Sequence, residues 1–255
     1  MHRYMVKSIV ALLCILVTAA RAYTEEDHLA ATVTFSGCTE FAGEGPIALA
    51  GAQGLVPSSY IITGANNGLA QIVVRATSCQ GLRVDGSAHG PAIVAHVGIN
   101  IESPDGTGDI NNYTVIYVTS SLSLARSLQR LGLPALYNSA LAYEFTPNSD
   151  GSSGTLYAEV SGDKLAPYFL YGTETNPSGG GAPFLANWWY NGCRGIIKMS
   201  TDFPDIAFGT ALETLYTSKV SLLGKLIGGN TYSNFSILAL HGVYSNAQMT
   251  VTLTR

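Results

Sequence analysis

The feature that most constrains the fold of this chain is a recurring pattern of short apolar segments with alternating residues. Val, Ile, Tyr and Thr are frequent in these segments, which favours strands over helices. Gly, Asn, Asp and Pro cluster between the segments, as is typical of turns. The segments that we expect to form strands are Ala70–Ala76, Ala92–Ile101, Asn112–Val118, Ala140–Phe145, Thr155–Val160, Tyr168–Tyr171, Arg194–Met199 and Gln248–Leu253.

Two segments break this pattern and predict helices. Ser120 or Ser121 can cap a helix that carries leucines at helical spacing and ends at Gly132. Ser218 can cap a second helix that ends at Gly228. Two or three helices among many strands predict a mainly β (α+β) fold. We expect a curled antiparallel sheet or β-barrel with the helices at its end or side.

The N-terminus predicts export. Arg3 and Lys7 flank the start of an apolar run, and Ala20-Arg21-Ala22 fits the small-x-small rule for signal-peptide cleavage. The run is shorter than the roughly 20 residues of a membrane-spanning helix. We therefore expect a signal peptide at 1–22, one domain at 23–255 and no membrane span. The predicted location is extracytoplasmic, either periplasmic or extracellular.

Composition excludes one class of partner. Removal of residues 1–22 takes three of the 13 Lys and Arg residues and leaves ten against 17 Asp and Glu, a net charge near −7. A protein with so few cations has little to neutralise phosphates, so we expect no nucleic-acid partner. Hydrophobic residues make up 47% of the chain and charged ones 12%, which indicates a large buried core.

Three cysteines remain after signal cleavage, namely Cys38, Cys79 and Cys193. Export favours oxidation, and Cys38 with Cys79 is the preferred disulfide because the two lie in similar turn-like sequences. A bond between Cys79 and Cys193 is the competing pairing.

The familiar catalytic signatures are missing from the sequence. It contains no Gly-x-Ser-x-Gly, no P-loop and no His-Glu-x-x-His, and we expect neither a metal site nor a cofactor. Lys198 stands out because it lies in an apolar strand segment. If its face of the strand is the barrel interior, desolvation would lower its pKa and make it a carbonyl-trapping nucleophile. If that face meets solvent, Lys198 is an ordinary surface lysine.

Three residues are candidates for lining an internal cavity: Arg75, Tyr117 and Trp188. Arg75 lies in a valine-rich strand, and a buried guanidinium needs an anion, either a carboxylate of the chain or one of a ligand. Trp188 shares a strand face with Tyr190 and could either line an apolar cavity or pack in the core.

Several segments carry a family resemblance. Leu55-Val56-Pro57, the segment Asn112–Tyr117, Leu131-Gly132-Leu133-Pro134 and Gly154–Tyr157 occur in an order that resembles the acetoacetate decarboxylase-like family, over about residues 45–170. The resemblance implies a cone-shaped β-barrel with a central cavity. Phe35–Glu40 and Phe184–Tyr190 also resemble a divergent branch of exported proteins, a likeness that implies no activity.

The same resemblance argues against the family's usual chemistry. Its decarboxylases use one of two adjacent lysines as a Schiff-base nucleophile. With Tyr117 and Pro134 as anchors, the lysine positions hold Ala135 and Leu136, and the family's Gly-Arg-Glu positions hold 127–129 (Ser-Leu-Gln). No amine is present there to form an imine, so catalysis is disfavoured.

Three functions follow from these observations. The favoured one is binding of a small ligand, largely apolar or carboxylate-bearing, in the cavity. The second is a lyase that acts on a keto acid or other carbonyl compound through Lys198. The third is a structural or surface-interaction protein whose interior is packed shut.

Overall fold

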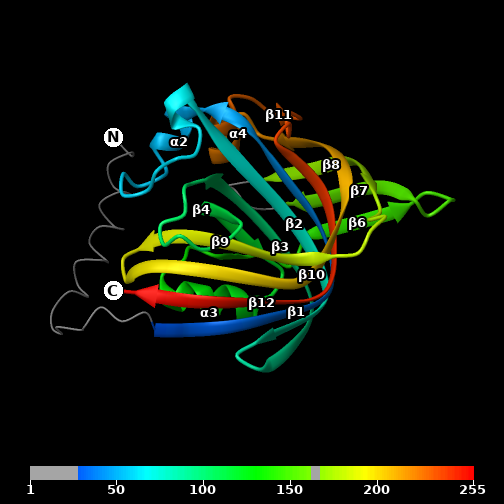
Figure 1. Ribbon diagram of the computed structural model, residues 1–255, viewed down its shortest axis with the longest axis horizontal. Helices are drawn as coiled ribbons and strands as arrows, with labels where there is room; N and C mark the ends of the chain where they lie inside the picture. The colour runs from blue at the N-terminus through cyan, green and yellow to red at the C-terminus, as the bar shows by residue number, and fades with distance from the viewer. Residues whose placement is uncertain (1–27, 162–166) are drawn as a thin grey trace.

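The computed structural model describes residues 28–161 and 167–255, so the predicted signal peptide lies outside the described residues (Figure 1). Its strands are β1 (His28–Ala48), β2 (Leu69–Val84), β3 (Ser87–Asn100), β4 (Ile110–Thr119), β5 (Leu136–Tyr137), β6 (Ala142–Pro147), β7 (Ser153–Val160), β8 (Tyr168–Thr175), β9 (Ala182–Gly192), β10 (Gly195–Thr217), β11 (Thr231–Tyr232) and β12 (Leu238–Thr254). Its α-helices are α2 (Leu49–Gln53), α3 (Leu122–Leu131) and α4 (Leu222–Ile227).

The sheet closes on itself, as the mainly β barrel prediction requires. The strand order runs β12-β1-β2-β3-β4-β9-β10, and β10 pairs with β12 to complete the ring. The pairs in this ring are antiparallel except for β4 with β9, which run parallel. Because side chains alternate across a strand, every second residue of each ring strand points into the barrel.

A second layer covers part of the barrel's outer face. Beyond its pairings in the ring, the long strand β10 pairs with β8 (Figure 1). Strand β8 in turn pairs with β7, and β7 pairs with β6. Leu156, Leu170 and Leu215 from this branch join a buried cluster with Phe41 and Val97 of the ring. The branch therefore shields apolar side chains that the outside of a free-standing barrel would expose to water.

Helix α3 lies against one end of the barrel, where its apolar face meets the interior side chains. Ser121 caps the helix by accepting a hydrogen bond from the Leu124 backbone N–H, and Gly132 ends it in the left-handed conformation. Leu124 and Leu128 are fully buried among residues such as Met199. The prediction of this helix from sequence is confirmed.

The second predicted helix exists, but its start was wrong. Helix α4 is capped by Ser221, which accepts from Gly224 N–H, rather than by Ser218. Ser218 uses its backbone carbonyl to accept from Ser221 and so forms the turn before the helix. Among the described residues, no helix is long and apolar enough to cross a membrane.

A disulfide joins Cys38 of β1 to Cys79 of β2, and this confirms the preferred pairing. The two residues are direct partners in the register of the antiparallel pair. Cys193 is free and exposed. Such a bond fits an oxidising, extracytoplasmic compartment.

This disulfide is expected to stabilise the fold measurably. It spans 41 residues, and the loop-entropy relation gives about 4 kcal/mol for a loop of that size, with typical values of about 2–4 kcal/mol. The double variant Cys38→Ala/Cys79→Ala should lose that much free energy of unfolding in urea. The matched control Cys193→Ser should change it by less than about 0.5 kcal/mol. Equal stabilities of wild type and double variant would contradict the prediction.

Candidate functional site

The barrel contains a cavity of about 530 Å³ at the end opposite α3. This volume lies in the range of about 300–1,000 Å³ that is usual for small-molecule sites. Most of its wall is apolar, and its main apolar members are Val73, Phe184, Trp188, Phe203, Phe208 and Leu240. Its main polar members are Glu40, Glu44, Arg75, Asn100, Asp109 and Asn112. Phe208 and Ile237 are partly exposed and mark the mouth.

An ion pair lies in the wall of the cavity, where the side chains of Arg75 and Glu40 are 15% and 5% exposed. Arg75 Nε donates to Glu40 Oε2 at 2.6 Å, and Arg75 Nη2 lies 2.5 Å from the same oxygen. The hydroxyls of Thr77 (3.1 Å) and Tyr244 (3.5 Å) also donate to this carboxylate, and Arg75 Nη2 contacts the Tyr244 oxygen. Burial opposes the charge on Arg75, but Glu40 outweighs it, and the pKa of the guanidinium is raised. The guanidinium of Arg75 therefore keeps its charge inside the barrel.

The glycine opposite Glu40 makes room for this pair. Gly242 of β12 is the register partner of Glu40, and a Cβ added to it would lie 2.9 Å from Glu40 Cγ. A larger residue at 242 would displace the carboxylate from Arg75.

An aromatic stack forms the wall beside the ion pair. The rings of Trp188 and His96 are stacked with centroids 3.4 Å apart, and Tyr117 meets His96 edge-on at 4.8 Å. Gly98 permits this stack, since a Cβ there would lie 2.6 Å from the Trp188 ring. Burial, with a smaller effect from Arg75, holds the pKa of His96 well below its usual value, so the imidazole is neutral.

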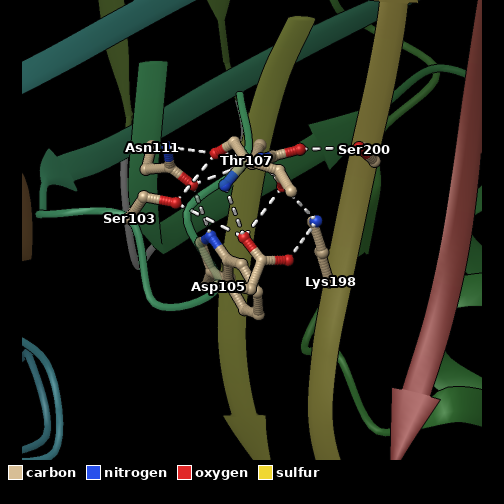
Figure 2. Close-up of polar contacts among 8 residues, drawn as sticks. Ser103, Asp105, Thr107, Asn111, Lys198 and Ser200 are labelled. Carbon is tan, nitrogen blue, oxygen red and sulfur yellow. Dashed lines mark hydrogen bonds and ion pairs between the residues drawn. The ribbon is translucent and has the colours of Figure 1, made fainter. Parts of the chain in front are cut away.

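A loop between β3 and β4 contributes to the mouth of the cavity. Hydrogen bonds with a lysine on the outer face of the barrel hold this loop in place. Ser103 and Asp109 of this loop line the cavity. Figure 2 shows Asp105 and Thr107 facing Lys198, whose Nζ lies 2.5 Å from Asp105 Oδ2 and 2.7 Å from Thr107 Oγ1. Burial opposes ionisation of Asp105, but hydrogen bonds from Lys198 and Thr107 prevail and lower its pKa.

The structure brings two of the predicted cavity residues together and separates Lys198 from them. Arg75 and Trp188 both line the cavity, while Tyr117 is buried one layer deeper, against His96. Lys198 lies on the outer face of β10, where it pairs with Asp105 and its ammonium sits 5.1 Å from the centre of the Trp189 ring. The condition set for a nucleophilic Lys198, a place in the barrel interior, is therefore not met. Its neighbours Ile197 and Met199 take the interior positions.

Sequence reasoning missed Glu40 and Glu44, because no strand was predicted before residue 70. Both project from β1 into the cavity with Ala42 between them. The signal was present in the alternation of Cys38, Glu40, Ala42 and Glu44 along one strand face.

A second group of buried acids lies outside the ring, between the barrel and the β6–β8 branch. The residues Glu174 and Glu213 are 0% and 2% exposed, and their carboxylate oxygens have no hydrogen-bond partner among the described residues. His241 Nε2 lies 3.7 Å from Glu174 Oε2. Burial raises the pKa of Glu174 to about 9, with a contribution from Glu213, and burial raises that of Glu213 to about 8.

Comparison with solved structures shows what this fold is. Acetoacetate decarboxylase from Legionella pneumophila superposes with a TM-score of 0.55 at 9% identity, over 94% of this chain and 92% of that one. The enduracididine biosynthesis enzyme MppR superposes with a TM-score of 0.52 at 11% identity, over 91% of this chain and 90% of that one. An acetoacetate decarboxylase-like enzyme from Sphingomonas wittichii superposes with a TM-score of 0.51 at 10% identity, over 89% of this chain and 93% of that one. No protein-family model and no curated protein matches the sequence.

These similarities define the class of protein by its fold: a β-barrel of the acetoacetate decarboxylase-like type. The resemblance stated from sequence is confirmed at the level of fold. At such low identity the similarity shows the architecture alone, and the chemistry has to be argued from the residues of the site.

Proposed function

We propose that this protein is exported and binds a small, largely apolar molecule in the barrel cavity without covalent chemistry. The observation that carries the proposal is the cavity itself, about 530 Å³ in volume, walled mainly by apolar and aromatic side chains and lined by no lysine of residues 28–161 and 167–255. A packed-shut interior, which a purely structural role would predict, does not fit this space.

The composition of the lining supports a ligand of mixed character. Trp188 contributes a large aromatic surface to the cavity, and the polar side chains of Glu40, Glu44 and Arg75 line the same space. A mostly apolar molecule with one polar group therefore suits the site better than a pure hydrocarbon.

Imine chemistry is disfavoured by the position of the amines. Ala135 is buried in the apolar end of the barrel, and Leu136 belongs to the cluster outside the ring. Lys198 is bound to Asp105 on the outer face. Borohydride treatment in the presence of a keto acid is expected to add no stable mass to the protein. A borohydride-stable adduct would restore the lyase hypothesis.

The binding proposal predicts that filling the cavity weakens binding. Ala42 lines the cavity, so Ala42→Phe should reduce the affinity for a bound apolar probe such as octan-1-ol at least tenfold, because the new ring occupies the ligand's volume. Ala88→Phe, in the exposed β2–β3 hairpin, is the matched control. Calorimetric titration and native mass spectrometry of the purified protein provide the measurements. Unchanged affinity in the Ala42 variant would place the binding elsewhere.

Export has its own test. Expressed with its natural N-terminus in a secreting host, the chain should appear outside the cytoplasm with Tyr23 as its first residue. Retention of an intact Met1 terminus in the cytoplasm would contradict this part of the proposal.

A further inference from the structure

The charges and rings of the cavity indicate the chemical class of its ligand, an inference that rests on the proposed binding function. Of the residues that the structure describes, three line the cavity with carboxylates, Glu40, Glu44 and Asp109, and Arg75 alone lines it with a guanidinium. Glu40 neutralises Arg75, and the pair leaves the remaining acids without a counter-charge in the cavity wall.

Glu44 is the acid without a partner. Its residue is 6% exposed, it lines the cavity, and no described group forms a hydrogen bond or ion pair with its carboxylate. Its neighbours in the register are Val73 of β2 and Leu238 of β12, both apolar. A buried carboxylate without a partner is unfavourable unless a cation or a donor reaches it.

Aromatic rings supply a second attraction for a cation in the same cavity. Phe184 lies 6.2 Å from Phe203 and 6.0 Å from Phe208 between ring centres, so three phenyl rings gather on one wall. Trp188 adds an indole to the lining. The faces of such rings attract cations, and the attraction grows in a site shielded from water.

Arg75 gives an anionic ligand little to bind. Its Nε and Nη2 atoms both contact Glu40 Oε2, so a ligand carboxylate that formed a two-point contact with these atoms would have to displace Glu40 and leave it buried and unpaired. The same ligand would also meet the unpaired charge of Glu44.

We propose that the ligand carries a positively charged nitrogen, as an amine or quaternary ammonium, on a largely apolar body. The nitrogen pairs with the Glu44 carboxylate, and the aromatic wall both attracts the cation and packs against its apolar body.

Three probes with one hydrocarbon tail test this proposal: octylamine, octan-1-ol and octanoate, each titrated calorimetrically at neutral pH. Octylamine is expected to bind about tenfold more tightly than octan-1-ol and more tightly still than octanoate. In Glu44→Gln the ratio of the amine and alcohol affinities should fall toward one. Glu144→Gln, which removes an exposed carboxylate from β6, should leave that ratio unchanged, and near-ultraviolet circular dichroism checks that both variants are folded.

The relative affinities of the three probes separate the cationic ligand from the binding function itself. Equal affinities for octylamine and octan-1-ol would overturn the cationic ligand and leave the apolar binding function standing. Tightest binding of octanoate would also overturn it and assign the ligand to Arg75. Failure of all three probes to bind would overturn the binding function together with this inference.

Discussion

Replacing Arg75 by methionine is expected to lower the free energy of unfolding by about 3–5 kcal/mol. The substitution removes the guanidinium from Glu40, which is 4% exposed and would be left as a buried charge with only hydroxyl donors. The measurement is urea unfolding followed by circular dichroism at neutral pH.

The double variant Arg75→Met/Glu40→Met separates lost packing from the unpaired charge. Two apolar side chains of similar volume should recover most of the lost stability, because a buried ion pair contributes little beyond what its own desolvation costs. A single Arg75 variant as stable as wild type would show that the pair is hydrated in solution. Additive losses in the double variant would show that the two side chains act independently.

Stability is expected to fall as the pH rises from 7 to 8, because of Glu174 and Glu213. The folded-state pKa values of these buried carboxyls are raised to about 9 and about 8, far above their ordinary value near 4.5. The folded chain therefore holds two protons that the unfolded chain has released. The stability that they contribute is complete below pH 4.5 and disappears as the pH passes through about 8 and 9. Each carboxyl should lower the free energy of unfolding by about 1.4 kcal/mol per pH unit within this window.

The histidines explain why the effect should be clearest above neutrality. Burial lowers the pKa of both His96 and His241 in the folded chain. Below about pH 6.5 these two side chains are therefore protonated in the unfolded chain while they stay neutral in the folded chain. That contribution has the opposite sign and offsets the carboxyls in acid. Between pH 7 and 8 both histidines are largely neutral in either state, so they contribute little to the slope.

Glutamine variants test which carboxyl groups cause the decline of stability with pH. Glu213→Gln should remove about half of the decline between pH 7 and 8, and Glu174→Gln/Glu213→Gln should remove nearly all of it. Thermal unfolding at matched ionic strength gives the comparison, with Glu144→Gln as the exposed control. An undiminished slope in the double variant would mean that other groups release the protons.

The sequence predicted the helices and most of the strands where local signals were strong. Ser121 and Gly132 delimit α3 because a cap and a left-handed glycine are short-range devices. Strand β1 was missed because its glycines and acids, such as Glu40 and Gly43, obscure the apolar alternation. Its second half, from Glu40 onward, lies between the cavity and the layer under β6–β8, so charges and small residues replace the usual apolar face.

By itself, the sequence determined the strand-rich character of this chain, the ends of α3 and the lack of an amine at positions 135 and 136, since all of these depend on residue type and near neighbours. Only the tertiary structure decided that Lys198 faces outward to Asp105 and that Arg75 is bound by Glu40. It also decided that Glu44 shares a cavity with aromatic side chains and has no partner within the described part of the chain. Which face of a strand is interior depends on how distant strands close the ring, and no local pattern contains that closure.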